Sequence, residues 1–185
     1  MQIKAILLAP LLATGLVSAA PSTKYTTFEV MALRSASPIH FSILQAADNG
    51  FYTHLPNQGA KCHTKSDNAV TFKLVGDQLY LYKSSGTAQK VWVDRSGMGQ
   101  GIMGYNTGTS KPKNGEFKGW KVDKNGALSF KGQGLIACPG APHDSWSIWV
   151  DAGVSNPGGN KGCLGFSART LKIKKPNSCK YTEQK

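Results

Sequence analysis

The fold of this chain is decided by a stretch that reads Phe72-Lys73-Leu74-Val75-Gly76-Asp77-Gln78-Leu79-Tyr80-Leu81-Tyr82. Apolar and polar residues alternate on both sides of Gly76-Asp77, which is typical of two strands joined by a tight turn. Residues 120–130 repeat this pattern around Asn125-Gly126, a favoured turn pair. Because no segment carries a sustained apolar stripe of helical period, the sequence predicts an all-β fold.

Strand patterns extend beyond these two hairpins. They cover residues 28–33, 39–45, 91–94, 135–138, 145–150 and 170–174. An aromatic-charged-aliphatic strand start recurs at Phe28, Phe72 and Trp120, after 44 and then 48 residues. Three units of this length favour a β-trefoil-like barrel in a single compact disulfide-containing domain, with a β-sandwich as the alternative.

The first residues carry the pattern of an export signal. Lys4 precedes an apolar stretch at residues 5–16, and small residues follow at 17–19. Residues 1–20 are therefore predicted to be a secretory signal peptide, and residues 21–185 a single all-β domain. No later run reaches the roughly 18 apolar residues that a membrane span requires, so we expect no transmembrane segment and a secreted, extracellular product.

Four cysteines remain after the signal peptide, namely Cys62, Cys138, Cys163 and Cys179. An even number of cysteines in an exported chain indicates two disulfides, for which three pairings are possible. Because no C-x-x-C pair is present, a zinc site is disfavoured. We expect neither a metal ion nor a cofactor.

The chain is strongly basic, with 22 Lys and Arg against 10 Asp and Glu and a formal net charge of +12. Such a surface attracts anionic polymers. Lys172, Lys174 and Lys175 stand beside Leu171 and Ile173 in a predicted strand, and lysines on one face also protect an edge strand from pairing. Edge protection and solubility are the preferred explanation, and a dedicated polyanion site is the alternative.

Two strands share one distinctive sequence. Val91-Trp92-Val93-Asp94 recurs as Ile148-Trp149-Val150-Asp151, and strand alternation places Trp and Asp on the same face. An aromatic plate beside a carboxylate is the composition of a sugar site, so Trp92, Asp94, Trp149 and Asp151 are candidate glycan-binding residues. In the alternative, both tryptophans cover the core and both aspartates cap turns, with Asp94 pairing with Arg95.

No catalytic residue is assigned. The two aspartates could form a glycosidase pair, but no further constellation supports it. His40, His143, Glu29 and Arg95 are residue types that a secreted ribonuclease could use, yet nothing in the sequence places them together. A secreted hydrolase or ribonuclease therefore remains an alternative to a binding protein.

Gly99, Gly101 and Gly104 have the G-x-G-x-x-G spacing of a dinucleotide-binding turn. That turn requires a helix to open within the glycines, whereas the residues that follow, 105–112, would not form one. The run is predicted to be a loop between strands, and no nucleotide is expected. Residues 103–119 and 152–162 are predicted to be long surface loops.

Several strings resemble the PhiA family of secreted fungal cell-wall proteins. They are Met1–Lys4, Val93–Gly101, Leu135–Pro139, Trp146–Trp149, Asp151–Val154 and Pro176–Cys179. The resemblance implies a secreted, non-enzymatic protein of the fungal cell wall, associated with conidium-bearing cells and asexual sporulation, with some members known as allergens. It implies wall polysaccharides or other wall components, including anionic ones, as partners and gives no reason to expect nucleic acid.

Overall fold

The computed structural model describes residues 26–184, so the expected signal peptide at residues 1–20 lies outside the described residues. The described part contains fourteen β-strands and two single 3-10 turns, η1 (Pro142–Asp144) and η2 (Pro157–Gly159). The predicted all-β class is therefore confirmed. Both predicted hairpins are present, at residues 72–81 and 120–130.

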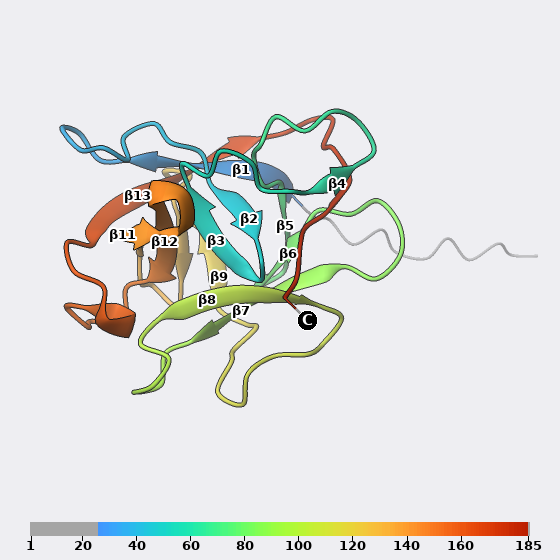
Figure 1. Cartoon of the computed structure of the whole chain (residues 1–185). Coiled ribbons are helices and arrows are strands. Elements are labelled where there is room, and N and C mark those ends of the chain that lie inside the picture. Colours follow the sequence, from blue (N-terminus) through green and yellow to red (C-terminus); the bar gives the residue numbers. More distant parts are fainter. Residues whose placement is uncertain (1–25, 185) are drawn as a thin grey trace, which may run out of the picture.

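Eight of the strands close into one antiparallel barrel (Figure 1). Their order is β11 (Leu135–Ala141), β13 (Leu164–Lys172), β1 (Thr26–Leu33), β5 (Phe72–Val75), β6 (Gln78–Leu81), β7 (Gln89–Asp94), β8 (Ile102–Thr107) and β12 (Ser145–Val150). β12 then pairs with β11, which completes the ring. This closed sheet confirms a barrel and a single domain, in place of the alternative sandwich.

Alternation along the strands directs every second side chain into the barrel. Phe28, Val30, Val91 and Val93 are all buried inside, while their chain neighbours point outward. Removing such side chains from water contributes roughly 25 cal/mol per Å² of apolar surface. The filled interior leaves the outer faces of the strands for binding.

Two smaller hairpins add side chains to the core of the barrel. β2 (Gln45–Ala47) and β3 (Gly50–Thr53) lie across the front of the barrel in Figure 1, and the Phe51 ring packs 5.3 Å from that of Tyr105. β9 (Trp120–Val122) pairs with β10 (Leu128–Phe130), and Trp120 packs edge-on against Phe130 at 5.0 Å. These aromatic contacts complete the core.

The suggested three-fold repeat does not extend to this barrel. The strands that begin at or near Phe28 and Phe72 are neighbours in it, whereas the strand at Trp120 pairs only with β10 in a separate sheet. The aromatic starts resemble one another because each buries a ring in the same core, not because they occupy equivalent positions.

Two local expectations were wrong. Residues 39–45 do not form one strand: 39–41 are a turn, in which Phe41 has a left-handed φ of 64°, Ile43 makes an isolated bridge to Met31, and Gln45 begins β2. Residues 103–107, expected within a loop, belong to β8, where Met103 and Tyr105 face the core between residues that point outward. The lysine pattern also extends past the strand: Lys172 is the last residue of β13 and pairs with Phe28 of β1, whereas Lys174 and Lys175 lie beyond it.

The structure selects one of the three possible disulfide pairings. Cys62 of β4 (Lys61–Cys62) bonds to Cys179 of β14 (Cys179–Lys180), and Cys138 bonds to Cys163. The first bridge spans a sequence separation of 117 residues, and the second spans 25. The long bridge attaches the C-terminal segment to the loop between β3 and β5.

A pair of carboxyl groups joins β1 to the same loop. Glu29, partly buried on the outer side of β1, shares a hydrogen bond with Asp67. Burial, together with the nearby Asp67 charge and this hydrogen bond, raises the pKa of Glu29 from 4.5 to about 7. The protonated carboxyl can donate to its partner, whereas two ionised carboxylates would repel each other.

Removal of the long disulfide should cost more stability than removal of the short one. Loop-closure entropy predicts losses of about 5 kcal/mol for Cys62→Ser with Cys179→Ser and about 3.5 kcal/mol for Cys138→Ser with Cys163→Ser. Urea unfolding of both double variants measures which of them loses more unfolding free energy. Equal losses, or the reverse order, would contradict it.

The Glu29–Asp67 pair should make stability depend on pH. Since the folded-state pKa of Glu29 is raised, its contribution is fully present below about pH 4.5 and is lost as pH rises through about 7. The unfolding free energy of Glu29→Gln relative to wild type should therefore increase across this window. Glu116→Gln removes a carboxyl whose pKa is lowered, so it should be less stable than wild type at neutral pH. This difference in unfolding free energy should shrink as pH falls. Parallel curves for Glu29→Gln and wild type would reject the effect.

Candidate functional site

The glycine run connects two antiparallel strands, as predicted. It leaves β7 at Asp94 and enters β8 at Ile102 without a helix. Gly101 has a φ of 97°, and a Cβ there would lie 2.0 Å from the Val150 carbonyl oxygen. A Cβ on Gly104 would lie 2.5 Å from the Trp92 ring. These glycines permit close approach within the protein.

The structure brings Trp92 and Trp149 together. Both line a hollow of about 290 Å³ on the outer side of the barrel, and Ile102 lies on the strand between them. The hollow arises because the first half of β12 pairs with β3 and the second half with β8. We call it the aromatic groove; Tyr52 of β3 also lines it.

Hydrogen bonds fix both indoles. Trp92 Nε1 donates to Asn106 Oδ1 at 2.7 Å, and Trp149 Nε1 donates to Ser147 Oγ at 2.9 Å. With their N–H groups engaged, the indoles offer mainly apolar ring surface to the groove. Trp92 is 8% exposed and serves as the floor, while Trp149 is more open. Such ring surfaces suit the apolar face of a sugar.

The polar rim comes from the turn between β2 and β3, which the sequence reasoning missed. Asp48 and Asn49 both have positive φ, as a two-residue hairpin turn requires. Asn49 Oδ1 accepts a hydrogen bond from the Gln184 backbone, so the C-terminal segment forms part of the rim. Among residues 26–184, the exposed Asp48 carboxylate has no hydrogen-bond partner and is available to accept from hydroxyl groups.

The aspartates predicted with the tryptophans lie elsewhere. Asp94 is buried, and its Oδ1 accepts from the Ser96 backbone at 2.9 Å. Asp151 Oδ1 accepts from the Gly153 backbone at 2.9 Å, and Asp151 lines a different hollow, of about 560 Å³. Both carboxylates therefore cap turns, as in the alternative interpretation of these residues.

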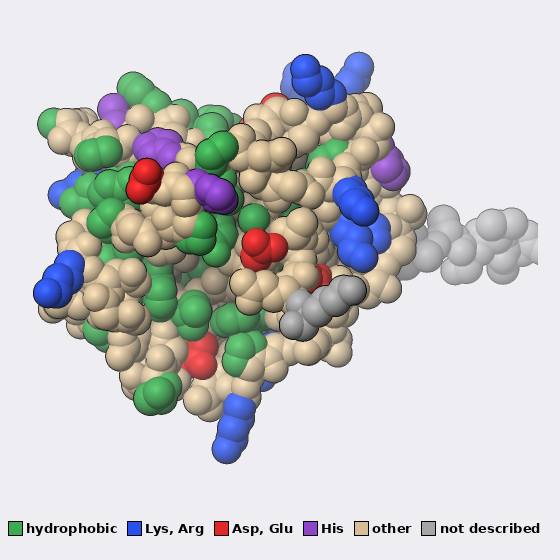
Figure 2. Space-filling view, in the orientation of Figure 1, with side chains coloured by type: hydrophobic (Ala, Val, Ile, Leu, Met, Phe, Trp, Pro, Cys, Tyr) green, Lys and Arg blue, Asp and Glu red, His purple; other side chains and the backbone are tan. Residues whose placement is uncertain are grey.

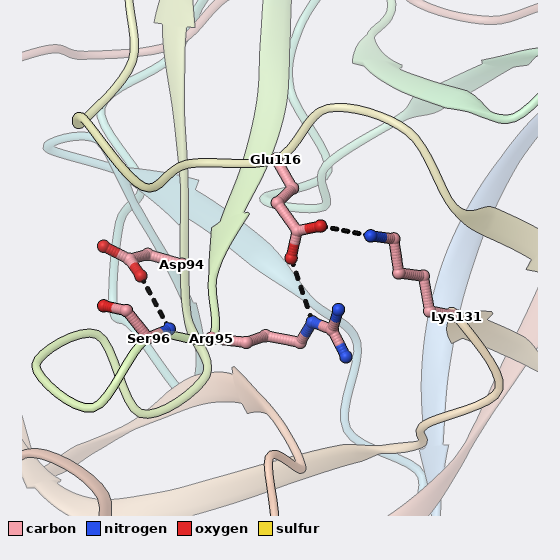
Figure 3. A network of polar contacts seen from close by, with 5 residues as sticks. All are labelled: Asp94, Arg95, Ser96, Glu116 and Lys131. Carbon is pink, nitrogen blue, oxygen red and sulfur yellow. Dashed lines mark hydrogen bonds and ion pairs between the residues drawn. The ribbon is translucent and has the colours of Figure 1, made fainter.

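An ion-pair network borders this second hollow (Figure 3). Arg95 Nε lies 3.1 Å from Glu116 Oε1, and Lys131 Nζ contacts the other carboxylate oxygen. The Lys131 hydrogen bond, with help from Arg95, lowers the pKa of Glu116 despite its partial burial. Arg95 therefore pairs with Glu116 and not with Asp94. A carboxylate held ionised in this way is a poor general acid.

The residue types considered for ribonuclease chemistry are dispersed. His40 lines a hollow beside the residues 53–55, Arg95 borders the Glu116 network, and His143 lies in η1. His40 Nδ1 accepts from the Arg34 backbone at 3.1 Å, which is a structural role. Glu29 has the raised pKa that an acid catalyst needs, but it lines none of these hollows.

Within residues 26–184, no three His, Cys, Asp or Glu side chains are grouped as metal ligands. The same part of the chain contains no helix of the length and apolarity that crossing a bilayer requires.

Comparisons with known proteins give the chain a family. The family described as PhiA-like secreted protein matches residues 28–182. The chain is 43% identical over 187 residues to Cell wall protein phiA of Aspergillus fumigatus, across 99% of this chain and 100% of that protein. Against Cell wall protein phiA of Aspergillus niger the identity is 45% over 186 residues, across 98% and 99%. The protein of the same name in Arthroderma benhamiae is 40% identical over 190 residues, across 98% and 100%.

No solved structure gives a significant match, so the fold is described from this chain alone. The resemblance seen in the short strings is confirmed by the family match and by relatives aligned over nearly their whole length. The chain belongs to the PhiA-like family of secreted proteins and is a protein of the cell wall.

Proposed function

We propose that this chain is a non-enzymatic wall protein of conidium-bearing structures, which binds neutral wall polysaccharide through the aromatic groove. The observation that carries the binding role is the meeting of Trp92, Trp149 and Tyr52 around one hollow beside the free Asp48 carboxylate. The role in conidiation is supported by the family resemblance of the strings quoted above.

The chemistry of the groove matches a sugar ring. Stacking requires a flat apolar surface, which the tryptophans supply, and orientation requires a few polar groups, which Asp48 and Gln184 supply at the rim. A volume of about 290 Å³ suits a short stretch of a glycan and not a bulky ligand. The wall location supplies polysaccharide at high local concentration.

The absence of catalysis is supported by the state of the carboxylates. Glu116 is held ionised by Lys131 and Arg95, while Asp94 and Asp151 are engaged in turns. A glycosidase of the usual kind needs a carboxyl that retains its proton beside a second carboxylate. Purified protein should therefore show no turnover of RNA, glucan, chitin or mannan, and turnover of any of them would overturn this part of the proposal.

Substitutions in the groove should weaken binding to neutral polysaccharide. We expect Trp149→Ala to reduce retention on immobilised glucan, chitin or mannan about tenfold, since an aromatic stacking contact contributes roughly 1 kcal/mol. Asp48→Asn should also reduce retention, and Trp149→Phe should keep part of the retention that Trp149→Ala loses. Retention in high salt separates this binding from charge attraction.

Phe41→Ala provides the matched control, because Phe41 is 63% exposed and lies outside the groove. It should leave retention unchanged. If Trp149→Ala behaves like Phe41→Ala, or if wild type is not retained on any of these polymers, the groove does not bind glycan.

The biological part of the proposal is tested by deletion in the source organism. We expect fewer conidia and an altered conidial wall composition, with recovery when the wild-type chain is restored. The Trp149→Ala chain should restore these traits less well than Phe41→Ala. Unchanged conidiation and wall composition after deletion would overturn the proposed role.

A further inference from the structure

Basic side chains gather around the long disulfide. They are Lys61, His63, Lys65, Lys175 and Lys180, all of them exposed, and we call this set the basic face. Figure 2 shows Lys and Arg side chains with a histidine at the upper right of the view, over β4 and the neighbouring loops. Other Lys and Arg in this view stand singly at the margins, so on this face of the molecule the basic side chains gather at the upper right.

Two of these lysines face each other directly. Lys61 pairs with Lys180 in the same two-residue ladder that pairs Cys62 with Cys179. Since side chains alternate, the disulfide takes one side of this ladder and both lysines take the other. Like charges directly opposite each other are destabilising, so the covalent bridge holds together an arrangement that repels itself.

A hollow of about 310 Å³ opens at His63 and Ser178, the chain neighbours of the two bridged cysteines. It is lined by His63, Thr64, Ser84 and Lys175, among others, and no acidic side chain lines it. Its walls are fixed, because the Asn177 side chain donates to the Thr64 carbonyl at 3.0 Å and the His63 backbone donates to the Ser178 carbonyl at 3.0 Å.

Three donors in this hollow are not engaged within the protein. Among residues 26–184, the His63 ring, the Thr64 hydroxyl and the Lys175 ammonium group have no hydrogen-bond partner. The two ion pairs of the described chain both involve Glu116, which lies elsewhere. None of the basic-face residues lies in β13, which ends at Lys172, so protection of that strand does not explain them.

We propose that the basic face binds the anionic groups of a wall polysaccharide, phosphate or carboxylate, with the 310 Å³ hollow receiving one such group. This inference rests on the proposed wall function and adds a second, charged attachment to the neutral aromatic groove. The Lys175 ammonium group and the Thr64 hydroxyl in the hollow match the oxygen acceptors of both anions.

The C-terminal segment connects the two sites. Ser178 lines the basic hollow and Gln184 lines the aromatic groove, so at most about 20 Å of extended chain separates them. One glycan chain with anionic branches can reach both sites. Two weak attachments on one polymer reinforce each other, because the second binding event becomes intramolecular.

The test measures retention on immobilised phosphorylated mannan, polygalacturonate and unmodified mannan at low and high salt. Wild type should bind at least one anionic polymer more strongly than unmodified mannan, with retention that falls as salt rises. Comparison of the phosphorylated and carboxylated polymers identifies the anion. The variant Lys61→Gln with Lys175→Gln and Lys180→Gln should weaken anionic retention at least tenfold and leave neutral retention unchanged.

The control removes three other exposed lysines, as Lys111→Gln with Lys113→Gln and Lys124→Gln, and has the same net charge. An equal loss in this control would overturn the site, because net charge alone would then account for binding. Unchanged anionic retention in the first variant, or tighter binding of RNA than of either anionic glycan, would overturn it as well.

The aromatic groove and the basic face can each be refuted without refuting the other. Trp149→Ala should spare anionic retention, whereas the basic-face variant should spare neutral retention. A protein that binds anionic polymers but no neutral one would refute the groove and keep the basic face. Thermal unfolding adds an independent check, since Lys61→Gln should raise the melting temperature slightly by removing the repulsion with Lys180.

Discussion

The pairing of β11 with β12 is the constraint on which the rest of the structure depends. It closes the barrel, and closure lets every second side chain form one buried interior while the outer faces are left for contacts. Because β11 occupies one side of β12, the opposite side must accommodate both β3 and β8. The aromatic groove lies at this division, so the closing pair also determines where the candidate site can form.

The outer surface carries three regions with different chemistry. The groove of Trp92 and Trp149 is largely apolar with a polar rim, the Glu116 network is internally neutralised by Arg95 and Lys131, and the basic face has unpaired donors. Each region is held by a different device, respectively strand pairing, ion pairs and a disulfide. The proposed functions assign neutral polysaccharide to the groove and anionic polysaccharide to the basic face.

Prediction from sequence worked where one physical rule acted alone. The alternation of residues 72–82 and 120–130 specified hairpins, because apolar side chains at every second position bury one face. It was wrong at residues 39–45, where an alternating pattern bends at Phe41, and at β8, where Gly104 resembles a loop residue. That glycine is a packing requirement, since Trp92 lies where its side chain would be.

The sequence by itself determined the all-β class, the two disulfides, the family and the two tryptophans of the candidate site, because these depend on local alternation, cysteine count and characteristic strings. Only the tertiary structure decided the closed barrel, the disulfide pairing and which side chains lie beside each tryptophan. Asp48 lies beside Trp149 although it comes from a distant turn, while Asp151, two residues after Trp149 and just beyond the end of β12, lines another hollow. Contacts between strands remote in the chain are set by barrel closure, which local patterns do not encode.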